Sequence, residues 1–139
     1  MTPLRRHPPR LDEAEQAQEH VAIVCNPRHF ASHTIVLILC DARAEPLLHV
    51  EVVDCDPDAG PTDCSTVLDN LLFESCPATT DVRGVVLALT RPGDEGVQAI
   101  DRTWFRAFHR ICHARRLRPL GVYVVGTHGA RPVQIDDAA

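Results

Sequence analysis

The sequence contains no lysine, because all 14 of its basic residues are arginine. The arginines accompany many alanine, valine and proline residues, so we interpret their excess as a coding bias rather than as a nucleic-acid signal. Aromatic residues are also few, with one Trp, one Tyr and four Phe, which argues against a base-stacking platform for single strands. The formal net charge of −5 argues against a general polyanion binder.

Long apolar runs and paired cysteine motifs are absent as well. The longest apolar run, Ile35 to Cys40, is too short to cross a bilayer, and the Arg/Pro-rich N-terminus has no signal-peptide pattern. We therefore expect no membrane partner and a cytoplasmic location. None of the six cysteines forms a Cys-x-x-Cys pair, which favours reduced thiols over a disulfide framework. Three of them lie in apolar segments and are expected to be buried: Cys40, Cys76 and Cys112.

What is present predicts one α/β (α+β) domain with a mixed sheet of about five strands and about three helices. The chain of 139 residues suits a single core. We expect a disordered tail over residues 1–10, one domain over 11–135 and a frayed end over 136–139. Hydrophobic periodicity predicts helices at 11–25, 65–75 and 96–117, and strands at 34–40, 47–53, 82–89, 120–125 and 133–135.

The helix predicted at 96–117 is the longest, and Pro119 is expected to end it. Its predicted core face consists of Ile100, Trp104, Ala107, Phe108 and Ile111. The opposite side carries a basic stripe, which we define as Arg102, Arg106, His109, Arg110, His113 and Arg116. This stripe suits an acidic protein partner or a phosphate backbone, and the simpler interpretation is a solvated helix face.

Four segments carry a family resemblance. They are Ile38-Leu-Cys-Asp41 at a strand end, Pro61 to Leu72 at a helix, Val85 to Gly93 at a strand and turn, and Leu120 to Gly126 at the last long strand. In this order they resemble the RadC-like branch of the JAB/MPN (JAMM) domain family, over about three quarters of the chain. The resemblance implies a cytidine-deaminase-like or JAB-type sheet and, in an intact member, a zinc-dependent hydrolase site.

The residues that would hold zinc are missing from this resemblance. The two ligand histidines of the family fall on Leu89 and Arg91, the ligand Asp on Asp101, and the general-base Glu on His33. Leucine cannot bind a metal, and arginine brings a permanent positive charge. We therefore expect no zinc cofactor and no catalytic residues. Arg91 is either an exposed loop residue or fills the former metal position by pairing with Asp101.

Three hypotheses for function follow from the sequence. The first is a catalytically inactive scaffold or protein-interaction module. The second is nucleic-acid binding through the basic stripe, which suits the association of the RadC name with DNA repair. The third is a metal-dependent hydrolase with a site rebuilt from other side chains, such as His33, Asp101, His109 or His128.

Overall fold

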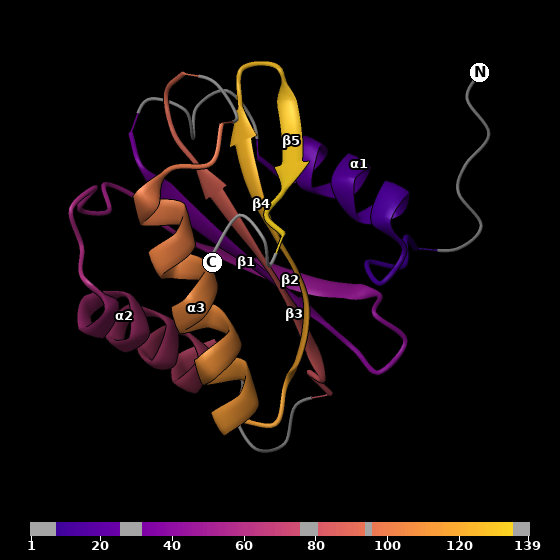
Figure 1. The fold of residues 1–139 in the computed structure, drawn as a ribbon. Coiled ribbons are helices and arrows are strands. Elements are labelled where there is room, and N and C mark those ends of the chain that lie inside the picture. The colour runs from indigo at the N-terminus through magenta and orange to yellow at the C-terminus, as the bar shows by residue number, and fades with distance from the viewer. Residues whose placement is uncertain (1–7, 26–31, 76–80, 94–95, 135–139) are drawn as a thin grey trace.

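The computed structural model describes residues 8–25, 32–75, 81–93 and 96–134. Its strands form one mixed sheet in the order β2-β1-β3-β4-β5 (Figure 1), in which β3 and β4 run parallel and the other neighbours antiparallel. This confirms the predicted class of fold. The elements are α1 (Ala14–Val24), β1 (Thr34–Cys40), β2 (Pro46–Val52), α2 (Pro61–Ser75), β3 (Gly84–Thr90), α3 (Ala99–Ala114), β4 (Arg118–Gly126) and β5 (Gly129–Pro132).

Strands β1 and β3 form the buried centre of the sheet, as their continuous apolar sequences predict. All seven residues of each strand are buried, because helices cover both faces of the sheet (Figure 1). Alternate residues of β1 serve the two faces. Ile35 and Leu37 pack in the cluster that includes α2 and α3, whereas Val36 and Ile38 pack in the cluster that includes α1.

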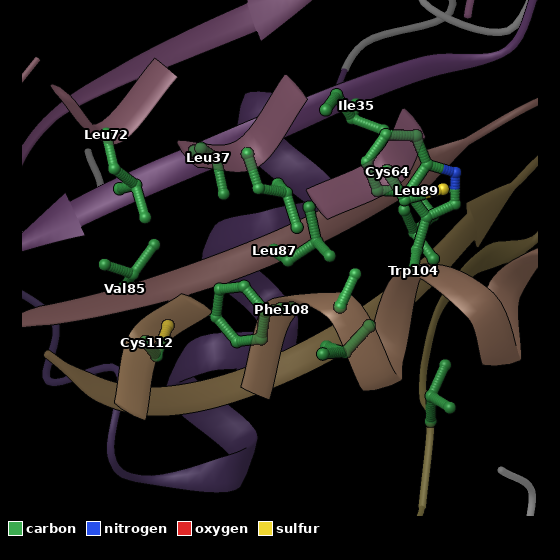
Figure 2. Packing of buried hydrophobic residues seen from close by; sticks show 14 of the residues in the cluster. Ile35, Leu37, Cys64, Leu72, Val85, Leu87, Leu89, Trp104, Phe108 and Cys112 are labelled. Carbon is green, nitrogen blue, oxygen red and sulfur yellow. The ribbon is translucent and has the colours of Figure 1, made fainter. Parts of the chain in front are cut away.

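The larger core lies between the sheet and α3, and Figure 2 shows its side chains. Trp104, Ala107 and Phe108 are buried there, which confirms the centre of the predicted core face of this helix. Ile100 and Ile111 are only partly buried at the margin of the same cluster. The one-turn spacing of the buried residues fixes which side of α3 faces the sheet and which side remains for other contacts.

The prediction that Pro119 ends the long helix is wrong. The helix ends at Ala114, and Pro119 lies inside β4 opposite Val85, next to a register shift. Arg116 adopts a positive φ of 57° and the Leu117 N–H donates to the Cys112 carbonyl at 2.8 Å. This backbone pattern is a Schellman-type helix end, with arginine where glycine is usual, and so the sequence carried no glycine signal for it.

Other boundaries also differ from the predictions. Helix α1 begins at Ala14 rather than residue 11, although Leu11 is buried before it and donates its N–H to the Ala44 carbonyl at 2.8 Å. Helix α2 begins at Pro61, four residues early, and α3 begins three residues late. The fifth strand is 129–132 rather than 133–135.

Residues 1–7 of the predicted N-terminal tail and all of the predicted frayed end, 136–139, lie outside the described residues, as does residue 135 of the predicted domain. Arg10 is described, and its side chain donates hydrogen bonds to Asp12 at 2.9 Å and to the Arg43 carbonyl at 3.2 Å. In the described part of the chain, no helix has both the length and the apolar character needed to cross a membrane.

Candidate functional site

The four positions that the family resemblance assigns to a metal site line one small cavity. His33 comes from the segment before β1, Leu89 from β3, Arg91 from the residue after β3, and Asp101 from the first turn of α3. The cavity has a volume of about 10 Å³, which is room for about one water molecule. Residues far apart in the sequence are thus brought together at one end of the sheet.

Arg91 and Asp101 form a buried ion pair at this cavity. The Arg91 Nη1 donates to Asp101 Oδ1, and Nη2 donates to the carbonyl of Gly96. Arg91 is 2% exposed and Asp101 1% exposed, so solvent cannot compensate either charge. The interpretation of Arg91 as an exposed loop residue is wrong, and the predicted pairing with Asp101 is confirmed. The guanidinium spans from the helix start to the loop before it.

Asp101 also caps the N-terminus of α3. Its Oδ2 accepts the backbone N–H of Gln98 at 2.7 Å, and the backbone N–H of Asp101 donates to the Gln98 side chain, which makes a reciprocal capping box. Both carboxylate oxygens are therefore engaged, one by Arg91 and one by the helix cap. Asp101 thus has a local role as a first-turn acid, and a metal ion would have to compete with these partners for its oxygens.

The walls of the cavity are not a metal-ligand set. Leu89 packs in the core cluster with Trp104 and Cys64, and Figure 2 shows the three side chains close together. His33 is half-buried, and its carbonyl accepts the N–H of Cys55 at 2.7 Å. Across residues 8–25, 32–75, 81–93 and 96–134, no group of three His, Cys, Asp or Glu side chains is placed to hold a metal ion.

The ligands suggested for a rebuilt metal site do not share one cavity. Of these four residues, His33 and Asp101 line the small cavity and His109 and His128 do not. His109 lies two turns further along α3, where its ring is 4.4 Å from that of Phe105 between centroids. His128 lies in the turn between β4 and β5.

The basic stripe on α3 is less uniform than predicted. Arg106, Arg110 and His113 are exposed, whereas Arg102 is half-buried. His109 is also half-buried against the rings of Phe105 and Phe108, and this burial lowers its pKa. Arg116 lies beyond the last helical residue and forms the positive-φ helix end. Four of the six stripe residues are therefore exposed, namely Arg106, Arg110, His113 and Arg116, and two are half-buried.

Sequence reasoning missed one ion pair that joins the two helices of this face. Arg115 Nε donates to Asp69 Oδ1 at 2.7 Å, and a second guanidinium nitrogen donates to the Asp69 carbonyl at 3.2 Å. The guanidinium also lies 5.9 Å from the centre of the Phe73 ring. The order of the elements alone gives no register between α2 and α3, so no sequence signal indicated this contact.

The cysteines behave as small core residues where the structure describes them. Cys25, Cys40, Cys64 and Cys112 are buried and reduced. Burial raises the pKa of both Cys25 and Cys40 to about 12 and that of Cys64 to about 11, which keeps these thiols protonated and unreactive. Cys76, the other cysteine predicted to be buried with Cys40 and Cys112, lies outside the described residues.

Comparisons with known proteins add no assignment. No protein-family model matches the chain, and no curated protein matches it either. The resemblance to RadC-like domains therefore depends on the residues of the four sequence segments alone.

Proposed function

We propose that this protein is a RadC-like, JAB-type domain without a metal site, which acts as a non-catalytic interaction or scaffold module. The observation that carries the proposal is the ion pair between Arg91 and Asp101, buried at the position that the family resemblance assigns to zinc. The guanidinium occupies the place of the dication and uses the carboxylate that would bind it. The partner in this proposal is another protein.

Electrostatics supports the loss of zinc chemistry. A catalytic zinc ion needs three protein ligands and one open position for water. Leu89 supplies no donor atom, Arg91 supplies a fixed positive charge, and Asp101 supplies one carboxylate that is already shared between Arg91 and the backbone of Gln98. Zinc binding would require Arg91 to leave a site in which its charge is paired and shielded from water.

The gathering of the four positions supports the alignment behind the resemblance. The pairing of β1 with β3 brings positions 33, 89 and 91 together, because Thr34 lies opposite Thr90, and Asp101 of α3 lines the same cavity from another element, as the alignment requires. Apolar patterning alone explains β1 and β3 in many α/β domains, whereas this convergence concerns the specific positions that carry chemistry in the family.

Nucleic-acid binding is retained as the alternative proposal, because Arg106, Arg110 and His113 remain exposed on α3. The half-buried Arg102 and His109 weaken it, since fewer cations remain for phosphates. The proposal of a rebuilt hydrolase site has no comparable support, because only two of its suggested ligands share a cavity.

The decisive experiment restores the family ligands. We expect the unaltered protein to purify without stoichiometric zinc, and the double variant Leu89→His, Arg91→His to bind zinc together with Asp101. Because zinc binds the folded state, excess zinc at about 100 times Kd should stabilise the double variant by about 2.7 kcal/mol. Elemental analysis and thermal unfolding with and without zinc measure both effects.

The matched control is the triple variant with Asp101→Asn added, which should lose the zinc response. Stoichiometric zinc in the unaltered protein would overturn the proposed loss of the site. A double variant that folds but shows no zinc response would instead count against the family resemblance.

A further inference from the structure

Strand β2 presents an open edge of the sheet. Within the described residues, β2 pairs with β1 on one side, and no strand pairs with its other side. Leu47 is 49% exposed and Leu48 45%, and Val53 just beyond the strand is 56% exposed. An edge strand beside exposed apolar side chains is a ready template for another strand.

The register with β1 assigns the side chains of β2 to the two faces of the sheet. Val52 lies opposite Ile35 and Val50 opposite Leu37, which places Leu48, Val50 and Val52 on the face of α2 and α3. By alternation, His49 and Glu51 lie on the face of α1, whereas Leu47 lies at an irregularity of the pairing, because Leu48 is opposite Leu39 and Pro46 is opposite Cys40. From Leu48 to Val52, one face of the edge is thus entirely aliphatic, and the other carries an imidazole and a carboxylate.

We propose that β2 pairs with β2 of a second copy of this chain, in an antiparallel arrangement with a two-fold axis through Val50. An axis perpendicular to the sheet keeps each face on its own side, so each residue must lie opposite a residue whose side chain is on the same face. Because side chains alternate between the faces, two opposite residues differ in number by an even amount. The axis therefore passes between the two copies of one residue. Centring it on Val50 places Leu48 opposite Val52 of the second copy and His49 opposite its Glu51.

This register matches each side chain from Leu48 to Val52 with a suitable partner. On the face of α2, aliphatic residues meet aliphatic residues across the new boundary. On the face of α1, the imidazole of each copy meets the carboxylate of the other, twice by symmetry, which is a favourable cross-strand pair. Leu47 and Val53, two of the most exposed aliphatic residues, lie at the two ends of this boundary.

The neighbouring registers lack this complementarity. An axis through Glu51 places the two Glu51 carboxylates opposite each other, and like charges in that position are destabilising. An axis through His49 places the two imidazoles together and Leu47 opposite Glu51. An axis through Leu48 places Glu51 opposite Glu45.

Because the sequence of β2 is complementary to itself, it favours a second copy of this chain over an unrelated peptide as the partner of the edge. The inference goes beyond the proposed loss of the metal site and does not depend on it, because it uses none of the residues around Arg91. The resulting sheet would run through both copies and remove the open edge at β2 from each.

Cysteine cross-linking tests the register. Val50→Cys places two thiols across the two-fold axis at a Cα separation of about 4.5–5.5 Å, within the range of a disulfide. Leu48→Cys is the matched control on the same face, because its two copies would lie about 13 Å apart along the strands. We expect a disulfide-linked dimer under mild oxidation from Val50→Cys, and only the background of the unaltered protein from Leu48→Cys.

A charge exchange tests the same pairing without cross-linking. His49→Glu places two carboxylates opposite each other and should shift the protein to monomer in sedimentation equilibrium, whereas His49→Glu, Glu51→Arg should recover the dimer. Phe73→Ser, which alters a side chain 73% exposed on α2, should leave the dimer intact. Circular dichroism verifies that each variant is folded.

A monomeric unaltered protein at concentrations up to about 1 mM, where even a weak association with a Kd near 1 mM would be visible, overturns the proposal. So does a Leu48→Cys variant that cross-links as well as Val50→Cys, because that result would require another register. Failure of these tests leaves the zinc experiment unaffected, so the two proposals stand or fall separately.

Discussion

Replacing Arg91 by leucine should be among the most destabilising single changes to a polar residue in this protein. The substitution removes the cationic partner of a carboxylate that is 1% exposed and leaves that charge hydrogen-bonded to the N–H of Gln98. Removing one member of a buried ion pair costs about 3–5 kcal/mol, because the remaining charge is neither solvated nor paired. The Gly96 carbonyl loses its hydrogen bond at the same time.

Urea unfolding followed by circular dichroism measures this loss, and thermal unfolding should show a Tm lowered by roughly 10–15 °C for a domain of this size. Arg115→Leu is the matched control, because it removes the same functional group from an ion pair with Asp69 that is partly open to solvent. That pair should contribute only about 0–1 kcal/mol. The difference between the two variants shows whether the loss of stability comes from the burial of the ion pair or from removing any arginine that forms an ion pair.

A double-mutant cycle identifies the pair as the cause. Asp101→Asn keeps an oxygen for the N–H of Gln98 but leaves Arg91 as an unpaired buried charge, so it should also destabilise the protein. The double variant Arg91→Leu, Asp101→Asn buries no charge and should cost clearly less than the sum of the two single changes. A cost for Arg91→Leu no greater than that of Arg115→Leu, or additive costs in the cycle, would refute the reasoning.

Two further predictions concern α3. Burial lowers the pKa of His109 in the folded state, so protonation favours unfolding, and the free energy of unfolding should fall as the pH drops through about 6.5. In urea titrations, His109→Gln should lose less of this free energy between about pH 7.5 and 5.5 than the unaltered protein does. An unchanged pH dependence in the variant would contradict this prediction. If α3 binds nucleic acid, DNA affinity should fall with rising salt and fall further in Arg106→Ala, Arg110→Ala, as fluorescence anisotropy would show, whereas salt-independent or absent binding would exclude that alternative.

The sequence predicted the centre of this fold better than its margins. The runs in β1 and β3 are apolar and rich in β-branched residues because both faces of these strands are covered, and such a pattern is legible without a structure. Strand β5 reads Gly-Ala-Arg-Pro and has no such pattern, since it is held by backbone pairing with the end of β4. The positive φ of Arg116 was likewise hidden, because arginine is not a typical residue at a helix end.

The sequence predicted which residues form the candidate site, but it did not predict all of their contacts. The pairing of Arg91 with Asp101 was predicted because the family resemblance aligns both residues with metal-ligand positions. The carbonyl of Gly96 was not foreseeable, because a backbone oxygen is present at every residue and only the path of the chain directs it toward the guanidinium. The partial burial of His109 was missed because helical geometry gives a direction and does not show how far the Phe105 and Phe108 rings extend.

A buried ion pair is weak evidence that charge itself stabilises a fold, since apolar residues of similar volume often do equally well. The arrangement around Asp101 gives a more specific reason for this one. Its carboxylate closes the capping box of α3, and that role alone favours an acid at this position. Because the same carboxylate is buried at the end of the sheet, it needs a cation, and with Leu89 unable to hold a metal the guanidinium of Arg91 provides that charge. The capping of α3 thus accounts for an acid at position 101, and the buried carboxylate of Asp101 accounts for a cation at position 91.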